Sequence, residues 1–116
     1  IILIDRFIDS TIAYQHYGLG VELALIKSIN KSILSNFKIS FTFLNLVNHK
    51  NMLKRLKARN SLNRYDNFDK NFYNKVQNGF IKLSKKNMSK YQIVDSNLDI
   101  KVNENLIINK IMKLIK

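Results

Sequence analysis

An acidic and a basic side chain stand together near the start of the sequence, directly after a short apolar run. Asp5 and Arg6 follow four consecutive aliphatic residues, 1–4. A carboxylate can organise a hydrated Mg²⁺ ion, and the planar fork of a guanidinium matches the oxygens of a phosphate group. The same two side chains also suit an ordinary ion pair that closes a strand. Their spacing alone leaves both interpretations open.

A second group of candidate residues consists of arginines in the middle of the sequence. The chain has 16 lysines but only four arginines, and three of them are Arg55, Arg59 and Arg64. Arginine binds phosphate in a bidentate manner that lysine cannot reproduce. Three guanidiniums around one loop could stabilise a transferring phosphoryl group, for which electrostatic stabilisation is the main requirement. A solvated basic face is the alternative interpretation.

Polar residues that follow Arg6 have structural interpretations of their own. Asp9 precedes a predicted helix and suits an N-cap position, and Ser10 and Thr11 also suit capping. Tyr14 is expected to pack, and the position of Gln15 indicates no particular chemistry by itself. The residues alone therefore assign none of these side chains to a site.

The apolar run 1–4 is the element expected to position Asp5 and Arg6. Aliphatic residues without polar alternation are typical of a strand that is buried on both faces, as in a parallel sheet. Ligands of open α/β sheets bind at the carboxyl ends of the strands, where this pair would lie. Because the run begins at residue 1, we expect the chain to lack an N-terminal part.

The remaining elements follow from hydrophobic periodicity and from turn-forming residues. Gly18 and Gly20 are expected to break the first helix, and 60–67 is expected to be a loop. Strands that alternate with helices predict an α/β class with a parallel sheet in one domain. The predicted helices span 10–17, 21–34, 49–59, 68–86 and 103–116, and the further strands span 41–47 and 91–95.

A stripe of apolar side chains runs along the predicted helix 68–86. Its members recur at helical spacing, so they face one side of the helix. We interpret the stripe as core rather than as a platform on which bases stack. It consists of Phe68, Phe72, Tyr73, Val76, Phe80 and Leu83.

Composition narrows the classes of function. The 116 residues carry a formal net charge of +12, which favours phosphate-bearing partners. The abundance of lysine and asparagine is also typical of an A+T-rich genome, so much of this charge is expected to be a solvated face. Without cysteine and with only two histidines, a thiolate or zinc site is not expected. No apolar run approaches the roughly 20 residues that span a bilayer, and we expect a soluble cytoplasmic protein.

Taken together, several motifs of this sequence resemble the thymidylate kinase (dTMP kinase) family. The family has a DR[YFH] strand end and an S-T-x-A-Y-Q helix, which Asp5–Phe7 and Asp9–Gln15 match. Residues 41–44 look like the strand that follows in the family. Residues 53–59 and 62–65 look like its arginine-rich LID. The resemblance extends over nearly the whole chain.

This resemblance implies a P-loop kinase-like three-layer fold with a parallel sheet, truncated at the N-terminus. Residues 1–116 would form the C-terminal part of a single kinase domain, with the LID at about 55–67. The implied reaction is phosphoryl transfer from ATP, with Mg²⁺, to dTMP, which gives dTDP in a homodimeric enzyme. The sequence contains no GxxxxGK[ST] phosphate-binding loop, so we expect the 116 residues alone to be inactive.

The family pattern also implies a role for each candidate residue. Arg6 would hold the acceptor phosphate and belong to the catalytic residues, and Asp5 would lie near Mg²⁺ through a water molecule. Ser10 and Thr11 would border the thymine, Tyr14 would lie against the deoxyribose, and Gln15 would line the same pocket. The arginines that would close over ATP and complete the catalytic set are Arg55, Arg59 and Arg64.

Two alternatives to a dTMP kinase remain at this point. One is another nucleoside or nucleotide kinase. The other is a small basic module that binds nucleic acid through its lysine-rich surface and counterion release.

Overall fold

The computed structural model describes residues 1–59 and 69–116. The chain divides into two compact units. The first unit comprises Ile1–Phe41 and Phe68–Lys90, and the second comprises Thr42–Asn67 and Tyr91–Lys116. The loop predicted at 60–67 lies outside the described residues.

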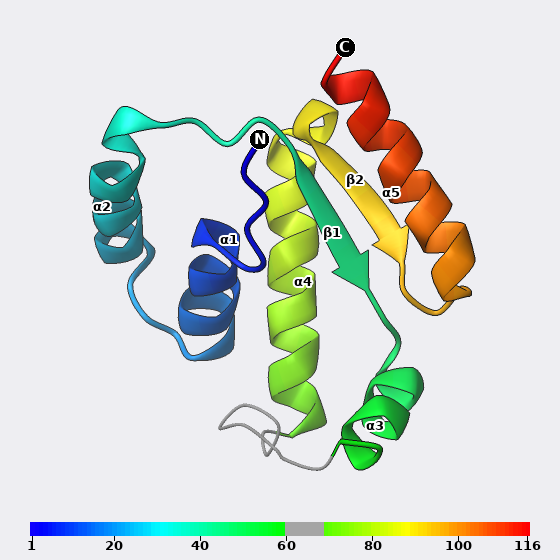
Figure 1. Ribbon diagram of the computed structural model, residues 1–116. Helices are drawn as coiled ribbons and strands as arrows, with labels where there is room; N and C mark the ends of the chain where they lie inside the picture. The colour runs from blue at the N-terminus through cyan, green and yellow to red at the C-terminus, as the bar shows by residue number, and fades with distance from the viewer. Residues whose placement is uncertain (60–68) are drawn as a thin grey trace. The chain divides into compact units, whose positions relative to one another are not determined.

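The first unit is helical in its described residues. A short helix, α1, continues directly into a π-helix, η1, and the long helix α4 lies against both (Figure 1). α4 begins after Asp69, whose carboxylate accepts a 2.8 Å hydrogen bond from the backbone N–H of Phe72 and so caps the helix. The elements are α1 (Ile8–Thr11), η1 (Ile12–Gly18), α2 (Leu23–Ile33), η2 (Leu34–Asn36), α4 (Lys70–Lys86) and η4 (Met88–Lys90).

The predicted helix 10–17 is present, but its second half is wider than an α-helix. The backbone N–H of Leu19 donates to Tyr14 O at 3.1 Å, five residues back. Val21 N–H donates to Gln15 O at 2.8 Å, which closes the end of η1. π-helical turns occur frequently at functional sites. Of the four site residues proposed from the sequence between Ser10 and Gln15, Tyr14 and Gln15 lie within this π-helix, and Ser10 and Thr11 lie in α1 before it.

The close approach of η1 and α4 depends on two glycines. A Cβ atom on Gly79 of α4 would lie 2.6 Å from Tyr17 Cδ2, and one on Gly18 would lie 2.7 Å from Phe72 Cε2. Neither position can therefore accept a larger side chain without displacing an aromatic ring. The buried apolar side chains among the described residues of the unit are Ile12, Ala13, Ile26, Phe72 and Val76.

The predicted core stripe on α4 is confirmed where the structure describes it. Phe72 and Val76 are buried, whereas Tyr73, Phe80 and Leu83 are half-buried. Phe68 lies outside the described residues. The periodicity of the sequence therefore identified the packed face of α4.

The strand predicted at residues 1–4 is wrong. These residues form no secondary structure, and the exposed fractions of their side chains fall from 92% at Ile1 to 56% at Ile4. A strand needs a neighbour to accept and donate its backbone hydrogen bonds. Among the described residues, the only sheet is formed elsewhere in the chain, so the aliphatic run has no partner. Asp5 and Arg6 thus follow an exposed extended segment.

The second unit is built on two parallel strands, and the arrowheads in Figure 1 point the same way. β1 (Thr42–Leu46) pairs with β2 (Tyr91–Asp95) in a register that sets Leu44 opposite Ile93. Leu44 and Val94 are buried. The predicted parallel sheet is confirmed, and both strands lie within one residue of their predicted bounds. The helices of this unit are α3 (His49–Lys57) and α5 (Ile100–Leu114).

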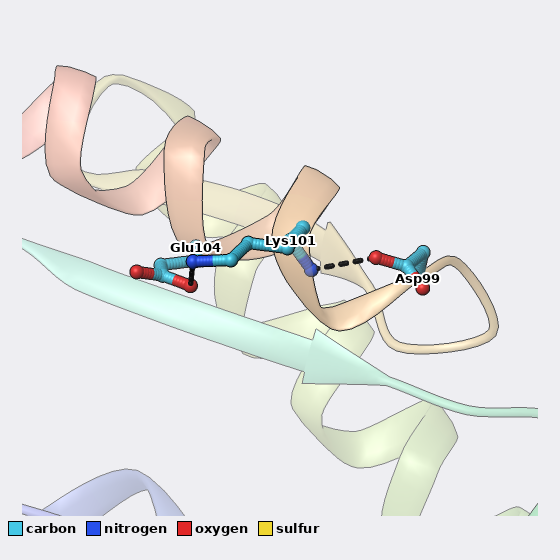
Figure 2. A network of polar contacts seen from close by, with 3 residues as sticks. All are labelled: Asp99, Lys101 and Glu104. Atoms are coloured by element: carbon cyan, nitrogen blue, oxygen red, sulfur yellow. Dashed lines mark hydrogen bonds and ion pairs between the residues drawn. The ribbon is translucent and has the colours of Figure 1, made fainter.

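α5 begins three residues before its predicted start. Asp99 caps the helix, because its carboxylate accepts a 2.8 Å hydrogen bond from the backbone N–H of Lys101. The Lys101 ammonium then reaches Glu104 Oε2 at 3.0 Å, as Figure 2 shows. Both side chains are largely exposed, so this ion pair contributes about 0.5 kcal/mol or less. The cap, which periodicity does not detect, decides where the helix starts.

Candidate functional site

Arg6 has an unusual backbone conformation. Its φ is +59°, and it is the one non-glycine residue with positive φ in the described part of the chain. An L-residue in this left-handed region costs about 1 kcal/mol or more, and such strain concentrates at functional sites. The bend at Asp5 and Arg6 turns the exposed N-terminal segment into α1. If the side chain of Arg6 had no role, a glycine could adopt this backbone conformation at a lower conformational energy.

Phe7 fixes the position of this bend. Its ring stacks on Phe37, with 5.8 Å between the centroids. Its carbonyl accepts hydrogen bonds from the backbone N–H groups of Ser10 and Thr11 at 3.0 and 3.4 Å, which starts α1. Arg6 is therefore held between an anchored aromatic residue and the exposed segment before it.

The guanidinium of Arg6 lies over the ring of Tyr14. Its Cζ atom is 5.7 Å from the ring centroid, within the range of a cation–π interaction. Tyr14 in turn packs on two rings of α4, with centroid distances of 6.1 Å to Phe72 and 6.3 Å to Phe80. A chain of aromatic contacts thus positions an exposed guanidinium. Its planar fork can bind a phosphate dianion through two parallel hydrogen bonds.

The polar residues proposed beside Arg6 lie on the same helical segment. Ser10 and Gln15 are half-buried, and Thr11 is exposed. Asp5 is exposed next to Arg6, and within the described residues these two side chains form no ion pair with each other. The first unit therefore contains, on α1, η1 and the bend before them, the residues that the family resemblance assigns to dTMP, the phosphate acceptor. We call them the acceptor-side residues; they are Asp5, Arg6, Ser10, Thr11, Tyr14 and Gln15.

The interpretation of Asp9 as an N-cap is wrong. α1 begins at Ile8, so the cap position belongs to Phe7 and Asp9 lies in the first helical turn. The reason is that the carbonyl of Phe7 already accepts the first two helical hydrogen bonds. A carboxylate in a first turn still interacts favourably with the helix dipole.

Arg55 belongs to the second unit, on α3. Its exposed guanidinium donates a hydrogen bond from Nη2 to the backbone carbonyl of Ser96, in the loop after β2. This loop leaves the carboxyl end of a parallel strand, which is where ligands of α/β sheets bind. Arg55 is therefore the predicted LID arginine that the structure brings to such a strand end.

Arg59 lies two residues beyond α3, because the helix ends at Lys57 rather than at 59. The backbone N–H groups of Ala58 and Arg59 donate to the carbonyls of Arg55 and Leu56, three residues back, in a tightened last turn. The side chain of Arg59 is exposed. Arg64 lies outside the described residues. The acceptor-side residues lie in the first unit, whereas Arg55 and Arg59 lie in the second.

Sequence reasoning missed one polar cluster in the second unit. The side chain of Asn97, after β2, accepts hydrogen bonds from Asn48 N at 3.1 Å and from Asn51 Nδ2 at 2.9 Å. It also donates from Nδ2 to Asp95 Oδ1 at 2.9 Å. The sequence contains one pattern that could have indicated this cluster. It is the run of turn-forming polar residues from Asp95 to Asn97, directly after a predicted strand.

Two other features, a metal-ion site built from three protein side chains and a membrane-spanning helix, are absent from the described part of the chain. Across the described ranges, no three His, Asp or Glu side chains lie close enough to hold a metal ion among themselves. Among the helices in the described part of the chain, none combines the length and apolar character needed to cross a membrane.

Comparison with known proteins points to one family. A family model described as thymidylate kinase matches residues 1–107. The chain is 46% identical over 80 residues to the thymidylate kinase of Wolbachia pipientis wMel. It is 34% identical over 100 residues to that of Sulfurihydrogenibium sp. (strain YO3AOP1). The crystal structure of thymidylate kinase from Ehrlichia chaffeensis matches with a TM-score of 0.60 and 27% sequence identity.

The matches cover most of this chain but only part of each relative. The Wolbachia match includes 69% of this chain and 39% of the relative, and the Sulfurihydrogenibium match includes 86% and 48%. The Ehrlichia structure covers 94% of this chain, whereas this chain covers 48% of that structure. The chain therefore spans about half the length, or less, of these relatives.

Proposed function

Because the chain belongs to the thymidylate kinase family, we propose that it supplies the acceptor-binding and LID parts of an enzyme that phosphorylates dTMP. The reaction transfers the γ-phosphoryl group of ATP to the phosphate of dTMP and gives dTDP. The observation that carries this proposal is the strained, aromatic-supported Arg6, whose exposed guanidinium suits a phosphate dianion. The basic nucleic-acid-binding module considered from composition is not favoured by the family match.

On the acceptor side, Arg6 holds the phosphate of dTMP and keeps it oriented toward the donor. Phosphoryl transfer depends mainly on positioning and on stabilisation of charge, so a fixed guanidinium is the side chain that this step requires. The contacts of Tyr14 with Phe72 and Phe80 support a role for its ring as a wall against the deoxyribose. The remaining acceptor-side residues, which would border the base and line the pocket, are Ser10, Thr11 and Gln15.

On the donor side, Arg55, Arg59 and Arg64 close over the phosphates of ATP. The hydrogen bond from Arg55 to Ser96 O supports this role for Arg55, because it holds the guanidinium beside the carboxyl end of β2. Arg59 and Arg64 are assigned from the family resemblance alone.

Mg²⁺ would neutralise the charge of the donor phosphates in this reaction. Mg²⁺ is commonly bound through one or two carboxylates, with water and substrate phosphates completing the shell. Asp5, an exposed carboxylate next to Arg6, fits such a site through a bridging water. Asp5 would then hold the hydrated ion near the acceptor phosphate.

A homodimer that acts in the cytoplasm is part of the same proposal. Three aliphatic side chains at a spacing of four residues are exposed on α2, which supports a contact with a second copy. They are Leu25 (55% exposed), Ile29 (52%) and Ile33 (45%).

The reaction can be tested in a hybrid enzyme in which this chain replaces the matching part of the Ehrlichia chaffeensis thymidylate kinase. We expect the hybrid to convert dTMP and ATP to dTDP and ADP, and to prefer dTMP to dUMP and dAMP by at least tenfold in kcat/KM. A coupled assay of ADP formation measures this preference, with the unmodified Ehrlichia enzyme as control. Turnover of dAMP or dUMP above that of dTMP would reject the assignment in favour of another nucleotide kinase.

A further inference from the structure

α3 is a helix with little apolar support. None of its nine residues, all of them in the described part of the chain, is fully buried. A helix of this length is marginal in water without tertiary contacts. By contrast, four residues of α4 are buried. Polar contacts therefore have to determine where α3 lies within its unit, and with it the position of Arg55.

Asn97 makes the most extensive of these contacts. Its Oδ1 accepts two hydrogen bonds from the start of α3, from the backbone N–H of Asn48 and from the side-chain amide of Asn51. Asn48 is the N-cap of α3, and its own Oδ1 accepts a 2.8 Å bond from Asn51 N. Asn97 thus holds the residue that caps the helix.

The same side chain is fixed on its other side to the end of β2. Its Nδ2 and its backbone N–H both donate to Asp95 Oδ1, each at 2.9 Å. The backbone N–H of Ser96 donates to Leu46 O at 2.7 Å, which ties the loop to β1 as well. The amide of Asn97 offers an acceptor toward α3 and a donor toward Asp95 in one side chain.

A second contact joins α3 to the loop after β2, about one helical turn beyond Asn51. Arg55, in the last turn of α3, donates to the carbonyl of Ser96, the residue before Asn97. The guanidinium reaches that carbonyl only while the first turn of α3 stays next to the loop. The two contacts therefore fix α3 at both ends against the same three residues, 95–97.

We propose that Asn97 is a positioning residue that sets Arg55 for the phosphate donor by holding the N-cap of α3 against the carboxyl end of β2. The role of Arg55 toward the phosphate donor rests on the proposed function. The effect of Asn97 on α3 rests on the hydrogen bonds alone. Loss of the amide releases the helix start, and the guanidinium then no longer stays beside the strand end.

Hydrogen exchange of the 116-residue chain tests the positioning role without reference to catalysis. In Asn97→Ala, we expect the amides of α3 to exchange at least tenfold faster, while those of α5 change less than twofold. Asn51→Ala, which removes only one of the two bonds to Asn97 Oδ1, is expected to give a smaller increase of about threefold. Asn105→Ala, on the exposed face of α5, is the matched control and should leave α3 unchanged.

Titration of the hybrid enzyme and of its Asn97→Ala variant with Mg-ATP tests the consequence for the donor. We expect the Arg55 Nε resonance of the hybrid enzyme to shift with ATP, and Asn97→Ala to weaken the apparent affinity about tenfold. Unchanged exchange in α3, or an equal increase in all helices, would overturn the positioning role. Equal ATP affinity in the variant would overturn its effect on Arg55. A hybrid enzyme that binds ATP without any shift of the Arg55 signal would refute the donor-side proposal, whereas the exchange comparison judges the positioning role by itself.

Discussion

Replacement of Arg6 by alanine in the hybrid enzyme is expected to lower kcat/KM for dTMP by about 100-fold. The loss of a bidentate contact with a phosphate dianion inside a closed site costs about 3 kcal/mol, which corresponds to this factor. Arg6→Lys keeps the charge but loses the planar fork, so we expect it to recover about a tenth of the wild-type value. Steady-state kinetics at saturating ATP measure these differences.

The strained backbone of Arg6 supplies a control that separates function from stability. Arg6→Gly removes the guanidinium but also relieves the cost of positive φ, which is about 1 kcal/mol. We expect this variant to be as inactive as Arg6→Ala and at least as stable as the wild type in urea denaturation. Activity of either variant within threefold of the wild type would contradict the role of Arg6 in binding the acceptor phosphate.

Phe72→Ala is expected to have the largest effect on stability, a loss of about 3 to 5 kcal/mol in the free energy of unfolding. The Phe72 side chain is 6% exposed, and its ring lies against Tyr14 and above Gly18. Because proteins of this size have about 5 to 15 kcal/mol in total, the variant loses a large part of its stability. Urea denaturation of the 116-residue chain, followed by circular dichroism, measures the change.

Two substitutions calibrate the Phe72 result. Phe72→Leu keeps most of the buried volume and is expected to cost about 1 to 2 kcal/mol. Asn71→Ala alters the adjacent exposed position of α4 and should change stability by less than about 0.5 kcal/mol. A loss below 1 kcal/mol for Phe72→Ala would show that the contact between η1 and α4 is not the core of its unit.

Periodicity predicted the elements that have a packed face. β1, β2 and α4 were predicted within two residues of their observed bounds, and the parallel pairing of the strands is confirmed. The buried Phe72 and Val76 have the helical spacing that identified them. The sequence also led to the thymidylate kinase family and its fold, both of which the comparisons confirm.

Features that depend on partners distant in the sequence were not predictable in this way. The run Ile1–Ile4 has the composition of a buried strand, but a strand forms only where a neighbour completes its hydrogen bonds. The cap by Asp99 and the network around Asn97 depend on single side-chain hydrogen bonds, which leave no periodic trace. The positive φ of Arg6 is likewise invisible in the residue type.

The proposed acceptor site could be predicted only as a set of residues. The motif from Asp5 to Gln15 named its members through the family resemblance, whereas the residues alone favoured an Asp5–Arg6 ion pair and left a phosphate site open. The structure adds that Arg6 is directed over Tyr14 instead. This contact joins residues eight positions apart across a bend, and local spacing does not indicate it.

The central claim is that this chain carries the acceptor side of a thymidylate kinase. Its most direct test is to measure whether Arg6 binds the phosphate of dTMP. The Arg6 Nε–Hε signal of the hybrid enzyme can be followed by nuclear magnetic resonance during titration with dTMP and, separately, with thymidine, which lacks the phosphate. We expect dTMP to shift this signal in a saturable manner and thymidine to leave it almost unchanged. Saturable binding of dTMP without any shift at Arg6 would contradict the claim.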